Sequence, residues 1–301
     1  MAMNLSGILP PMITPFKQNG DMDYEAFVFN MEKWNQTGLS GYVVLGSNSE
    51  TAFLNEEEKL KLVELAVKHS GGRTIMAGTG METPRDTIEL TNKAAALGAD
   101  CALLLTPCYY NTAMTSAALY EYFAEVADKC KIPILLYNVT KFTKVNISPD
   151  LFGKLAKHPN IVGAKDSNGD VPQFASYMRA IAGEDFKIFV GTAAALYPAL
   201  TLGAVGGILA LANCCPVESV EVYDEFKEGN LNTALEIYQR MFPINTAVTA
   251  TYGIAGLKHA CSLLGFQGGY VRRPLLELNE KDKEAIKAIL EKAGIRGVAR
   301  A

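Results

Sequence analysis

Eight short apolar runs alternate with segments of helical periodicity, and this alternation restricts the fold of the 301-residue chain more than any other feature. Short apolar runs bounded by turn residues are typical of strands buried on both faces, as in a parallel sheet. A helix between successive strands is the connection that a parallel sheet requires. The runs cover residues 7–12, 41–45, 74–77, 101–105, 132–137, 161–164, 188–190 and 207–211.

Two of the intervening segments carry signals of helix starts. Asn55 is placed to cap a helix, and Glu58 can complete a capping box with it. Ser148 followed by Pro149 is a hydroxyl cap with proline at the first helical position. Eight strands alternating with helices predict an α/β fold, the (β/α)8 or TIM barrel. A doubly wound open sheet is the alternative.

Beyond residue 217 the strand-like runs stop. Helical periodicity indicates three further helices, near residues 218–247, 253–264 and 279–294. We therefore expect residues 1–217 to form the barrel that carries the active site, and residues 218–301 to form a C-terminal helical region packed on it. Apolar residues make up 49% of the chain, which is enough for one large core.

The charge distribution gives no reason to expect nucleic acid or membrane as a partner. Lys and Arg number 28 against 32 Asp and Glu, so the net charge is −4. Residues 188–217 carry no charge and are long enough to span a bilayer. Pro198, Asn213 and several glycines interrupt this stretch, so we expect a buried strand, helix and strand instead.

The compartment is indicated by the amino-terminal residues and the cysteines. Residues 1–16 hold no basic residue and include two adjacent prolines, which is not typical of a signal or transit peptide. The six cysteines form no CxxC pair, so we expect buried thiols rather than disulfides. A cytoplasmic protein is the expectation.

Lys165 ends the sixth apolar run, and the polar residues 166–170 follow at once. Parallel α/β folds place their chemistry at the carboxyl ends of the strands. One interpretation is a solvated lysine that merely closes a strand. The other is a nucleophile that forms a Schiff base, because an amine attacks a carbonyl only when neutral, and a buried apolar site favours the neutral form.

Several other strand ends carry hydroxyls and tyrosines. Residues 46–50, Gly-Ser-Asn-Ser-Glu, follow the second run, and backbone N–H groups in such a turn can hold a carboxylate. A turn containing Tyr110 follows the fourth run, the fifth ends at Tyr137, and Gly191 follows the seventh. A lysine, tyrosines and hydroxyls form a set for proton transfer around an amine.

The sequence lacks the residues that other chemistries need. Its three histidines, His69, His158 and His259, lie on or near expected helices, whereas a zinc aldolase needs several at strand ends. GxSxG, Walker A and zinc-ligand spacings do not occur, and the GxG at residues 78–80 lacks its third glycine. We expect neither a metal nor a cofactor.

Three motifs resemble the signatures of the dihydrodipicolinate synthase / N-acetylneuraminate lyase superfamily. They are residues 46–50, the pair Tyr137-Asn138, and residues 163–167, Gly-Ala-Lys-Asp-Ser. The spacing from Tyr137 to Lys165 also fits, and the likeness extends from residue 7 to residue 269. The resemblance implies a class I, pyruvate-dependent enzyme on a (β/α)8 barrel with a helical C-terminal region.

The resemblance also implies roles for individual residues. Lys165 would form the imine with the 2-oxo acid, and Tyr137 would shuttle the proton at the bond that is made or broken. Tyr110 would reach into a neighbouring subunit's site, so a homo-oligomer is implied, either a dimer or a dimer of dimers. The implied substrate-binding residues are Ser47 and Asn48 at the carboxylate, and Ser167 and Gly191 along the pocket.

Within the superfamily the chain is most similar to the 4-hydroxy-2-oxoglutarate aldolases. Dihydrodipicolinate synthases usually carry an arginine five residues after the tyrosine, to bind the carboxylate of aspartate semialdehyde, and Phe142 stands there. A buried apolar ring cannot replace a bidentate clamp. N-acetylneuraminate lyases carry acidic residues where Ala193 and Ala194 follow the seventh run. Ser49 and Thr140 replace a usual glycine and proline, so we expect a divergent loop at residues 140–145, near the distal end of the substrate.

Three hypotheses stay open. The first is an aldolase on a 2-oxo acid, most like 4-hydroxy-2-oxoglutarate aldolase. The second is a synthase or hydro-lyase that uses the same imine, such as dihydrodipicolinate (4-hydroxy-tetrahydrodipicolinate) synthase or a 2-keto-3-deoxy sugar acid dehydratase. The third is a catalytically silent barrel used for binding. The presence of both Lys165 and Tyr137 argues against the third.

Overall fold

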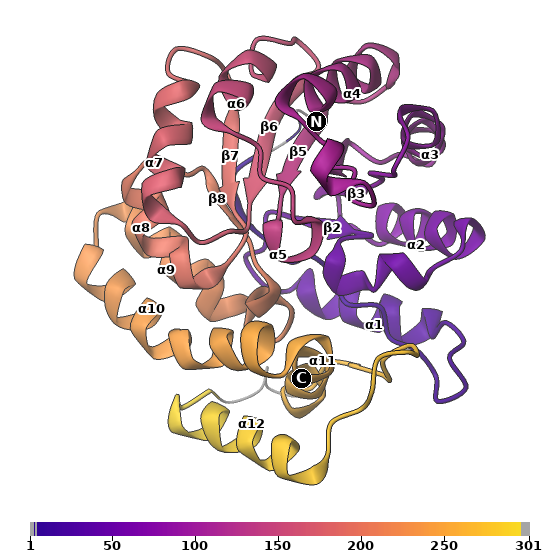
Figure 1. Ribbon diagram of the computed structural model, residues 1–301. Coiled ribbons are helices and arrows are strands. Elements are labelled where there is room, and N and C mark those ends of the chain that lie inside the picture. The colour runs from indigo at the N-terminus through magenta and orange to yellow at the C-terminus, as the bar shows by residue number, and fades with distance from the viewer. Residues whose placement is uncertain (1–2, 4, 296–301) are drawn as a thin grey trace.

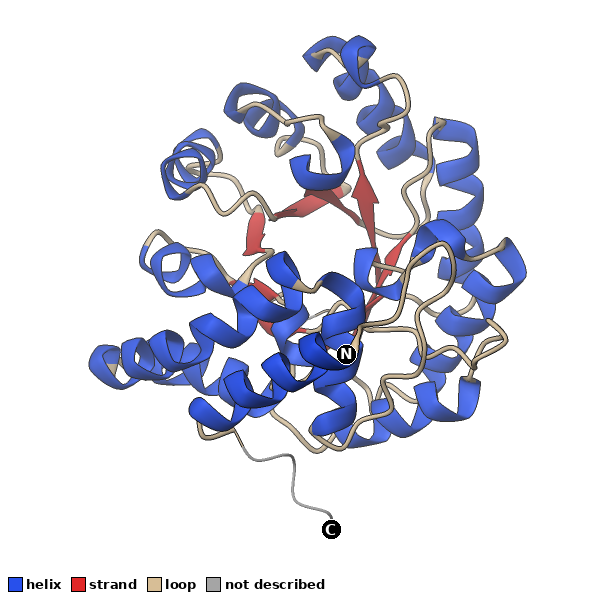
Figure 2. Ribbon diagram, turned by 60° about the horizontal axis from the view of Figure 1, so that its bottom comes forward, coloured by secondary structure: helices blue, strands red, loops and turns tan. Residues whose placement is uncertain are grey.

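The computed structural model describes residue 3 and residues 5–295, in which eight parallel strands form a ring surrounded by helices (Figure 1, Figure 2). The predicted (β/α)8 barrel is therefore confirmed. The strands are β1 Gly7–Leu9, β2 Gly41–Val44, β3 Thr74–Gly78, β4 Cys101–Leu105, β5 Ile134–Asn138, β6 Ile161–Asp166, β7 Lys187–Val190 and β8 Gly206–Ile208.

The ring closes because the first strand pairs with the last. β1 is parallel to β8, with Gly7 opposite Gly206. On its other side, Pro11 forms a parallel bridge with Val43 of β2. A doubly wound open sheet has two free edges and is excluded by this pairing.

Nine helices of the described residues follow the strands in chain order, two of them after β5. They are α1 Tyr24–Trp34, α2 Glu56–Lys68, α3 Pro84–Ala96, α4 Ser116–Lys129, α5 Thr140–Thr143, α6 Pro149–Leu155, α7 Val171–Ala180, α8 Leu196–Thr201 and α9 Pro216–Glu228. The capping box of Asn55 and Glu58 is formed at the start of α2, and Ser148 caps α6 with Pro149 at its first position. Both predicted helix starts are confirmed.

Two apolar clusters follow from the alternation of side chains along each strand. The smaller fills the inside of the barrel and includes Leu9, Met76, Leu135 and Phe189. The larger lies between the strands and the surrounding helices. A residue that points into the barrel near a carboxyl end is thus buried among apolar side chains, which is where the candidate site lies.

The chain after β8 differs from the expectation in one respect. The single helix predicted at residues 218–247 is wrong, because Gly229 adopts a left-handed conformation (φ 88°) that ends α9. The remaining elements are α10 Leu231–Thr246, a π-helical turn Ala247–Thr251, α11 Gly253–Leu263 and α12 Glu280–Lys292, the last packed on α10 and α11 (Figure 1). The predicted division between residues 217 and 218 falls within α9, which contacts β1, and the division into a barrel and a C-terminal helical region stays a prediction.

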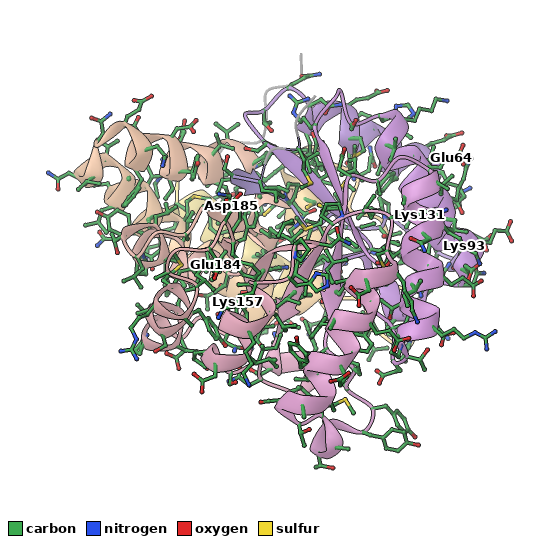
Figure 3. All side chains as sticks on the ribbon, turned by 90° about the horizontal axis from the view of Figure 1, so that it is seen from above. Glu64, Lys93, Lys131, Lys157, Glu184 and Asp185 are labelled. Atoms are coloured by element: carbon green, nitrogen blue, oxygen red, sulfur yellow. The ribbon has the colours of Figure 1, made fainter. Side chains whose placement is uncertain are left out.

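The uncharged stretch at residues 188–217 forms most of β7, then α8 and β8, as predicted. No helix within residues 5–295 combines the length and apolar character that a bilayer crossing needs. Charged residues such as Glu64 and Lys93 extend from the outer faces of the barrel helices (Figure 3). All six cysteines are free, as expected, and four are buried, whereas Cys108 and Cys130 are partly exposed.

Candidate active site

Lys165 and Tyr137 face each other from neighbouring strands. They are register partners on β6 and β5, so their side chains point to the same side of the sheet. Lys165 Nζ lies 4.3 Å from the centroid of the Tyr137 ring. Only 2% of Lys165 and 4% of Tyr137 is exposed, and Phe189 is the partner of Lys165 on β7. Lys165 is therefore not the solvated lysine of the alternative interpretation.

The Tyr137 hydroxyl is surrounded by groups that stabilise its ionised form. Burial alone would raise the pKa of Tyr137, but the charge of Lys165 opposes this effect, and hydrogen bonding from Ser47, Ser167 and Lys165 adds to the opposition. The net result is a pKa below the usual value of 10. The structure thus brings together the lysine, the tyrosine and two of the predicted hydroxyls.

Three loops that follow strands each carry a buried polar atom without a hydrogen-bond partner in the described residues. These atoms are Thr14 Oγ1 after β1, Asn48 Nδ2 after β2 and Thr106 Oγ1 after β4. Buried polar groups without partners are costly, so such atoms indicate a place where a polar ligand is received. Of these three residues, the sequence predicts Asn48 as a site residue. Thr14 and Thr106 were missed, although their positions after strands are a visible signal.

Gly191 is required by the close approach of the loops after β6 and β7. A Cβ atom at this position would lie 1.8 Å from Ser167 Oγ and 2.9 Å from Ser167 Cα. Its backbone N–H donates to the Asp166 carbonyl oxygen at 2.6 Å. Gly191 therefore leaves the space that the Ser167 side chain occupies.

A buried polar network lies behind the lysine, on the opposite face of the same two strands. Asn138 Nδ2 lies 2.9 Å from Asp166 Oδ1, and Asn138 Oδ1 accepts the backbone N–H of Ile147. The Tyr177 hydroxyl donates to the Ile147 carbonyl oxygen at 2.8 Å. Burial raises the pKa of Asp166 to about 6, although the hydrogen bond from Asn138 opposes the rise.

Two predicted site residues are largely exposed, unlike the buried Lys165 and Tyr137. Tyr110 is 72% exposed and packs edge-on against Tyr109, with ring centroids 5.0 Å apart. Phe142 is 56% exposed, so the expectation of a buried ring is wrong. The reason is that the loop at residues 140–145 includes the short helix α5, which places Phe142 on its outer side.

Residues 46–50 form a tight turn whose last residue makes contacts that the sequence did not indicate. Ser47, Asn48 and Ser49 form a 3₁₀ turn, with Ser49 Oγ donating to the Met12 carbonyl oxygen at 2.6 Å. The Glu50 carboxylate is buried and pairs with Lys258 of α11. No local pattern links residues so distant in the chain.

No cluster of His, Cys, Asp and Glu within residues 5–295 has the arrangement of a metal site. The polar groups at the carboxyl face are instead hydroxyls, an amide, a phenol and an amine. This set suits an organic anion with a carbonyl group, because it supplies hydrogen-bond donors and one amine.

A closed (β/α)8 barrel with a buried lysine and tyrosine at the carboxyl ends of its strands defines the class: an enzyme of the TIM-barrel type. The chain belongs to the Dihydrodipicolinate synthetase family, whose profile matches residues 4–293. The superfamily resemblance is therefore confirmed, and the chain is a lyase or synthase of this family. The finer resemblance to 4-hydroxy-2-oxoglutarate aldolases is not shown by the relatives reported below.

Two similar proteins are both named as synthases. 4-Hydroxy-tetrahydrodipicolinate synthase of Methanothrix thermoacetophila is 36% identical over 286 residues, covering 95% of this chain and 96% of the relative. The synthase of Methanoculleus marisnigri is 37% identical, covering 96% and 99%.

Solved structures of the family have the same fold. Dihydrodipicolinate synthase from Acinetobacter baumannii, complexed with pyruvate, superposes with a TM-score of 0.92 at 30% identity, covering 97% of this chain and 100% of that one. A prophage protein of the dihydrodipicolinic acid synthase family from E. coli K12, in complex with pyruvate, gives a TM-score of 0.91 at 29% identity, covering 96% and 99%.

Proposed function

We propose that the chain is a class I enzyme that binds pyruvate as a Schiff base on Lys165 and makes or breaks a C–C bond at pyruvate C3. The observation that carries the proposal is the buried Lys165–Tyr137 pair, with Nζ 4.3 Å from the ring centroid. Family relatives that were solved with pyruvate support the choice of 2-oxo acid.

The chemistry assigns a step to each group. The neutral Lys165 amine adds to the C2 carbonyl of pyruvate, and loss of water leaves an iminium ion. Removal of a C3 proton gives an enamine, whose C3 then bonds to the carbonyl carbon of an aldehyde while the aldehyde oxygen takes up a proton. Water finally releases the product and the free amine. Retro-aldol cleavage is the reverse.

Tyr137 is the group that moves the protons in this scheme. Its lowered pKa and its hydroxyl contacts suit a group that gives and takes a proton beside a cation. Ser47 and Asn48 hold the carboxylate in this proposal, with Asn48 Nδ2 as a buried donor without another partner among the described residues. Ser167 and Gly191 line the pocket.

The test is reductive trapping. Borohydride should inactivate the protein only when a 2-oxo acid is present, and peptide mass mapping should locate the adduct on Lys165. Lys165→Ala should abolish trapping, and so should Lys165→Arg, because a guanidinium stays charged and is no nucleophile. An adduct on another lysine, or no adduct with pyruvate, would overturn the proposal.

The aldehyde partner has two candidates. The relatives favour condensation with aspartate semialdehyde, the reaction of a 4-hydroxy-tetrahydrodipicolinate synthase. The second candidate is retro-aldol cleavage of 4-hydroxy-2-oxoglutarate to pyruvate and glyoxylate. Phe142 is compatible with it, because the glyoxylate carboxylate is bonded directly to the reacting carbon and ends two carbon atoms short of the place where synthases bind the carboxylate of aspartate semialdehyde, a place taken here by an exposed apolar ring. The nearby Lys141 Nζ already donates to the Thr249 carbonyl oxygen at 3.1 Å.

Kinetic comparison decides between the two aldehydes. A missing charge-assisted hydrogen bond costs about 1.5–3 kcal/mol, or roughly tenfold to a hundredfold in kcat/KM. Phe142→Arg should raise kcat/KM for aspartate semialdehyde by that factor, and the uncharged control Phe142→Gln should not. Efficient use of aspartate semialdehyde by the unaltered chain, with no gain in Phe142→Arg, would assign the synthase reaction and show that another group binds the carboxylate.

A further inference from the structure

The turn at residues 46–50 has backbone strain at both of its ends. Leu45 has φ 61° and Glu50 has φ 55°, so two residues with side chains occupy the left-handed region. This conformation is unfavourable for residues other than glycine, and it persists only where the surrounding structure holds it. Leu45 is held by burial of its side chain, at 2% exposure. Glu50 is held by an ion pair and a hydrogen bond instead.

Glu50 is held by two groups from the C-terminal region. Its carboxylate is 0% exposed, and Oε1 lies 2.5 Å from Lys258 Nζ on α11. Oε2 accepts the backbone N–H of Arg272 at 2.8 Å. Lys258 also donates to the Tyr270 carbonyl oxygen at 2.6 Å, so the ammonium group is shared between the turn and the segment before Arg272.

Arg272 extends this contact to the helix that follows the turn. Its guanidinium forms a bidentate pair with Glu58 of α2, at 2.7 and 2.8 Å, and also donates to the Phe53 carbonyl oxygen. The ring of Phe16 lies close to both cations, 4.5 Å from Lys258 Nζ and 4.4 Å from Arg272 Cζ. The end of the turn and the helix that follows it are thus both tied to residues 258–272.

The same turn carries the groups that face the reacting centre. The Ser47 hydroxyl stabilises ionised Tyr137, and Asn48 Nδ2 is buried without a partner in the described chain. A small shift of such groups is expected to reduce activity, since misplacement of a reacting group by about 1 Å can reduce a rate by about a hundredfold.

We propose that Glu50, Lys258 and Arg272 are positioning residues, through which the C-terminal region sets the turn that receives the carboxylate of the 2-oxo acid. The proposal rests on the proposed function, because it concerns the affinity of the same site for pyruvate. Stability alone does not explain the pair, because two charges buried this deeply lose much of their mutual attraction to desolvation.

The test measures how trapping depends on pyruvate concentration. Lys258→Met removes the ammonium and keeps an unbranched side chain of similar length. The half-saturating pyruvate concentration should rise about tenfold or more, because a turn that has shifted loses roughly one hydrogen bond to the carboxylate. The trapping rate at saturating pyruvate should change much less, because Lys165 and Tyr137 remain in place.

Lys33→Met is the matched control. Lys33 Nζ donates to the Gly265 carbonyl oxygen at 2.8 Å and so also ties the C-terminal region to the barrel, but through α1 and away from the turn. We expect this variant to keep the half-saturating concentration of the unaltered chain. Circular dichroism without pyruvate shows that each variant is folded.

Each outcome has a distinct meaning. The proposal is supported if the half-saturating pyruvate concentration rises in Lys258→Met and not in Lys33→Met. It is overturned if this concentration is unchanged in Lys258→Met, or if it rises equally in Lys33→Met. If Lys258→Met does not fold, the double variant Glu50→Gln/Lys258→Met, which leaves no unpaired buried charge, is judged by the same criterion. Absence of trapping in the unaltered chain would instead refute the Schiff-base function.

Discussion

At the scale of single residues, Tyr137 combines two opposing influences. Burial disfavours its ionised form, and the adjacent Lys165 charge favours that form. A phenol whose pKa is lowered by an adjacent cation can exchange a proton with a substrate atom at little cost in free energy, provided that the cation stays beside it. In the proposed mechanism the Lys165 ammonium and the later iminium ion each place a cation beside Tyr137, whereas the amine is neutral while it adds to the carbonyl.

We expect Tyr137→Phe to slow exchange of the pyruvate C3 protons with solvent by about 10²–10⁴, the usual contribution of a placed acid–base group. Imine formation on Lys165 should survive, since the amine is unchanged. Deuterium incorporation, followed by NMR, measures the exchange. Tyr42→Phe is the control, because Tyr42 is a buried barrel tyrosine whose hydroxyl binds Asn35 instead. Equal exchange rates in the two variants would show that another group moves the proton.

The raised pKa of Asp166 leads us to expect that the free energy of unfolding depends on pH. Its pKa rises from 3.8 to about 6 on folding, so the folded chain binds an extra proton between these values. The stabilisation that this proton gives the folded state is fully present below about pH 3.8 and is lost as the pH rises through about 6. At about 1.4 kcal/mol per pH unit, the loss is roughly 3 kcal/mol.

The variant Asp166→Asn lacks this titration. Relative to it, the unaltered chain should lose unfolding free energy between about pH 4 and pH 7, as measured by urea denaturation across that range. Asp185→Asn, at an exposed position, is the control and should show no such difference. A difference in unfolding free energy that is constant with pH would contradict the assignment of the raised pKa.

At the scale of elements, the positions of the barrel strands can be predicted directly from the sequence, whereas the conformations of the loops are harder to predict. The strand from residue 161 was readable because apolar residues fill both faces, and it continues one residue past Lys165. Gly229 was overlooked as the end of a helix, although glycine followed by asparagine is a usual stop signal. The position of Phe142 depends on how a four-residue helix tilts, which no periodicity reveals.

Gly191→Ala tests the close approach of two strand ends. The new methyl group would lie 2.9 Å from Ser167 Cα, a backbone atom that cannot move aside by rotation. We expect a loss of about 1–3 kcal/mol in unfolding free energy, together with weaker pyruvate binding. Ser167→Ala is the comparison, because it removes the hydroxyl without adding volume. Stability is measured by thermal unfolding. If Gly191→Ala unfolds at the same temperature as Ser167→Ala, the expected clash is contradicted.

At the scale of the whole molecule, Tyr110 poses the question of assembly. It is 72% exposed, and its ring packs edge-on against that of Tyr109, which is 78% exposed. Exposed aromatic pairs are typical of protein interfaces. The predicted dimer, in which Tyr110 serves a neighbour's site, stays a prediction.

Mixed oligomers test this prediction. Lys165→Ala and Tyr110→Phe should each lower activity, and co-refolding the two variants should restore part of it, because one site then receives Lys165 from one protomer and Tyr110 from the other. Mixing Lys165→Ala with Tyr137→Phe is the control and should restore nothing, since both residues belong to the same protomer's site. Full activity of Tyr110→Phe by itself would rule out the shared site.

Long-range contacts explain what sequence reasoning could not reach. Lys165, Tyr137 and the hydroxyls could be predicted because each stands at the end of an apolar run. Lys258 and Arg272 stand in the interior of a helix and in a loop, with nothing local to distinguish them from solvated cations. Their role emerges only when the fold brings them to Glu50.

That contact has a consequence for the growing chain. Arg272 lies 222 residues after Glu50, and proteins leave the ribosome amino end first. The turn is therefore synthesised long before the residues that hold it, and β1 must likewise wait for β8. A ribosome-bound fragment that already displays Lys165 lacks a completed pocket for a 2-oxo acid. Under the proposed function, capture of a 2-oxo acid on Lys165 therefore begins only after residues up to Arg272 have been synthesised and have folded onto the turn.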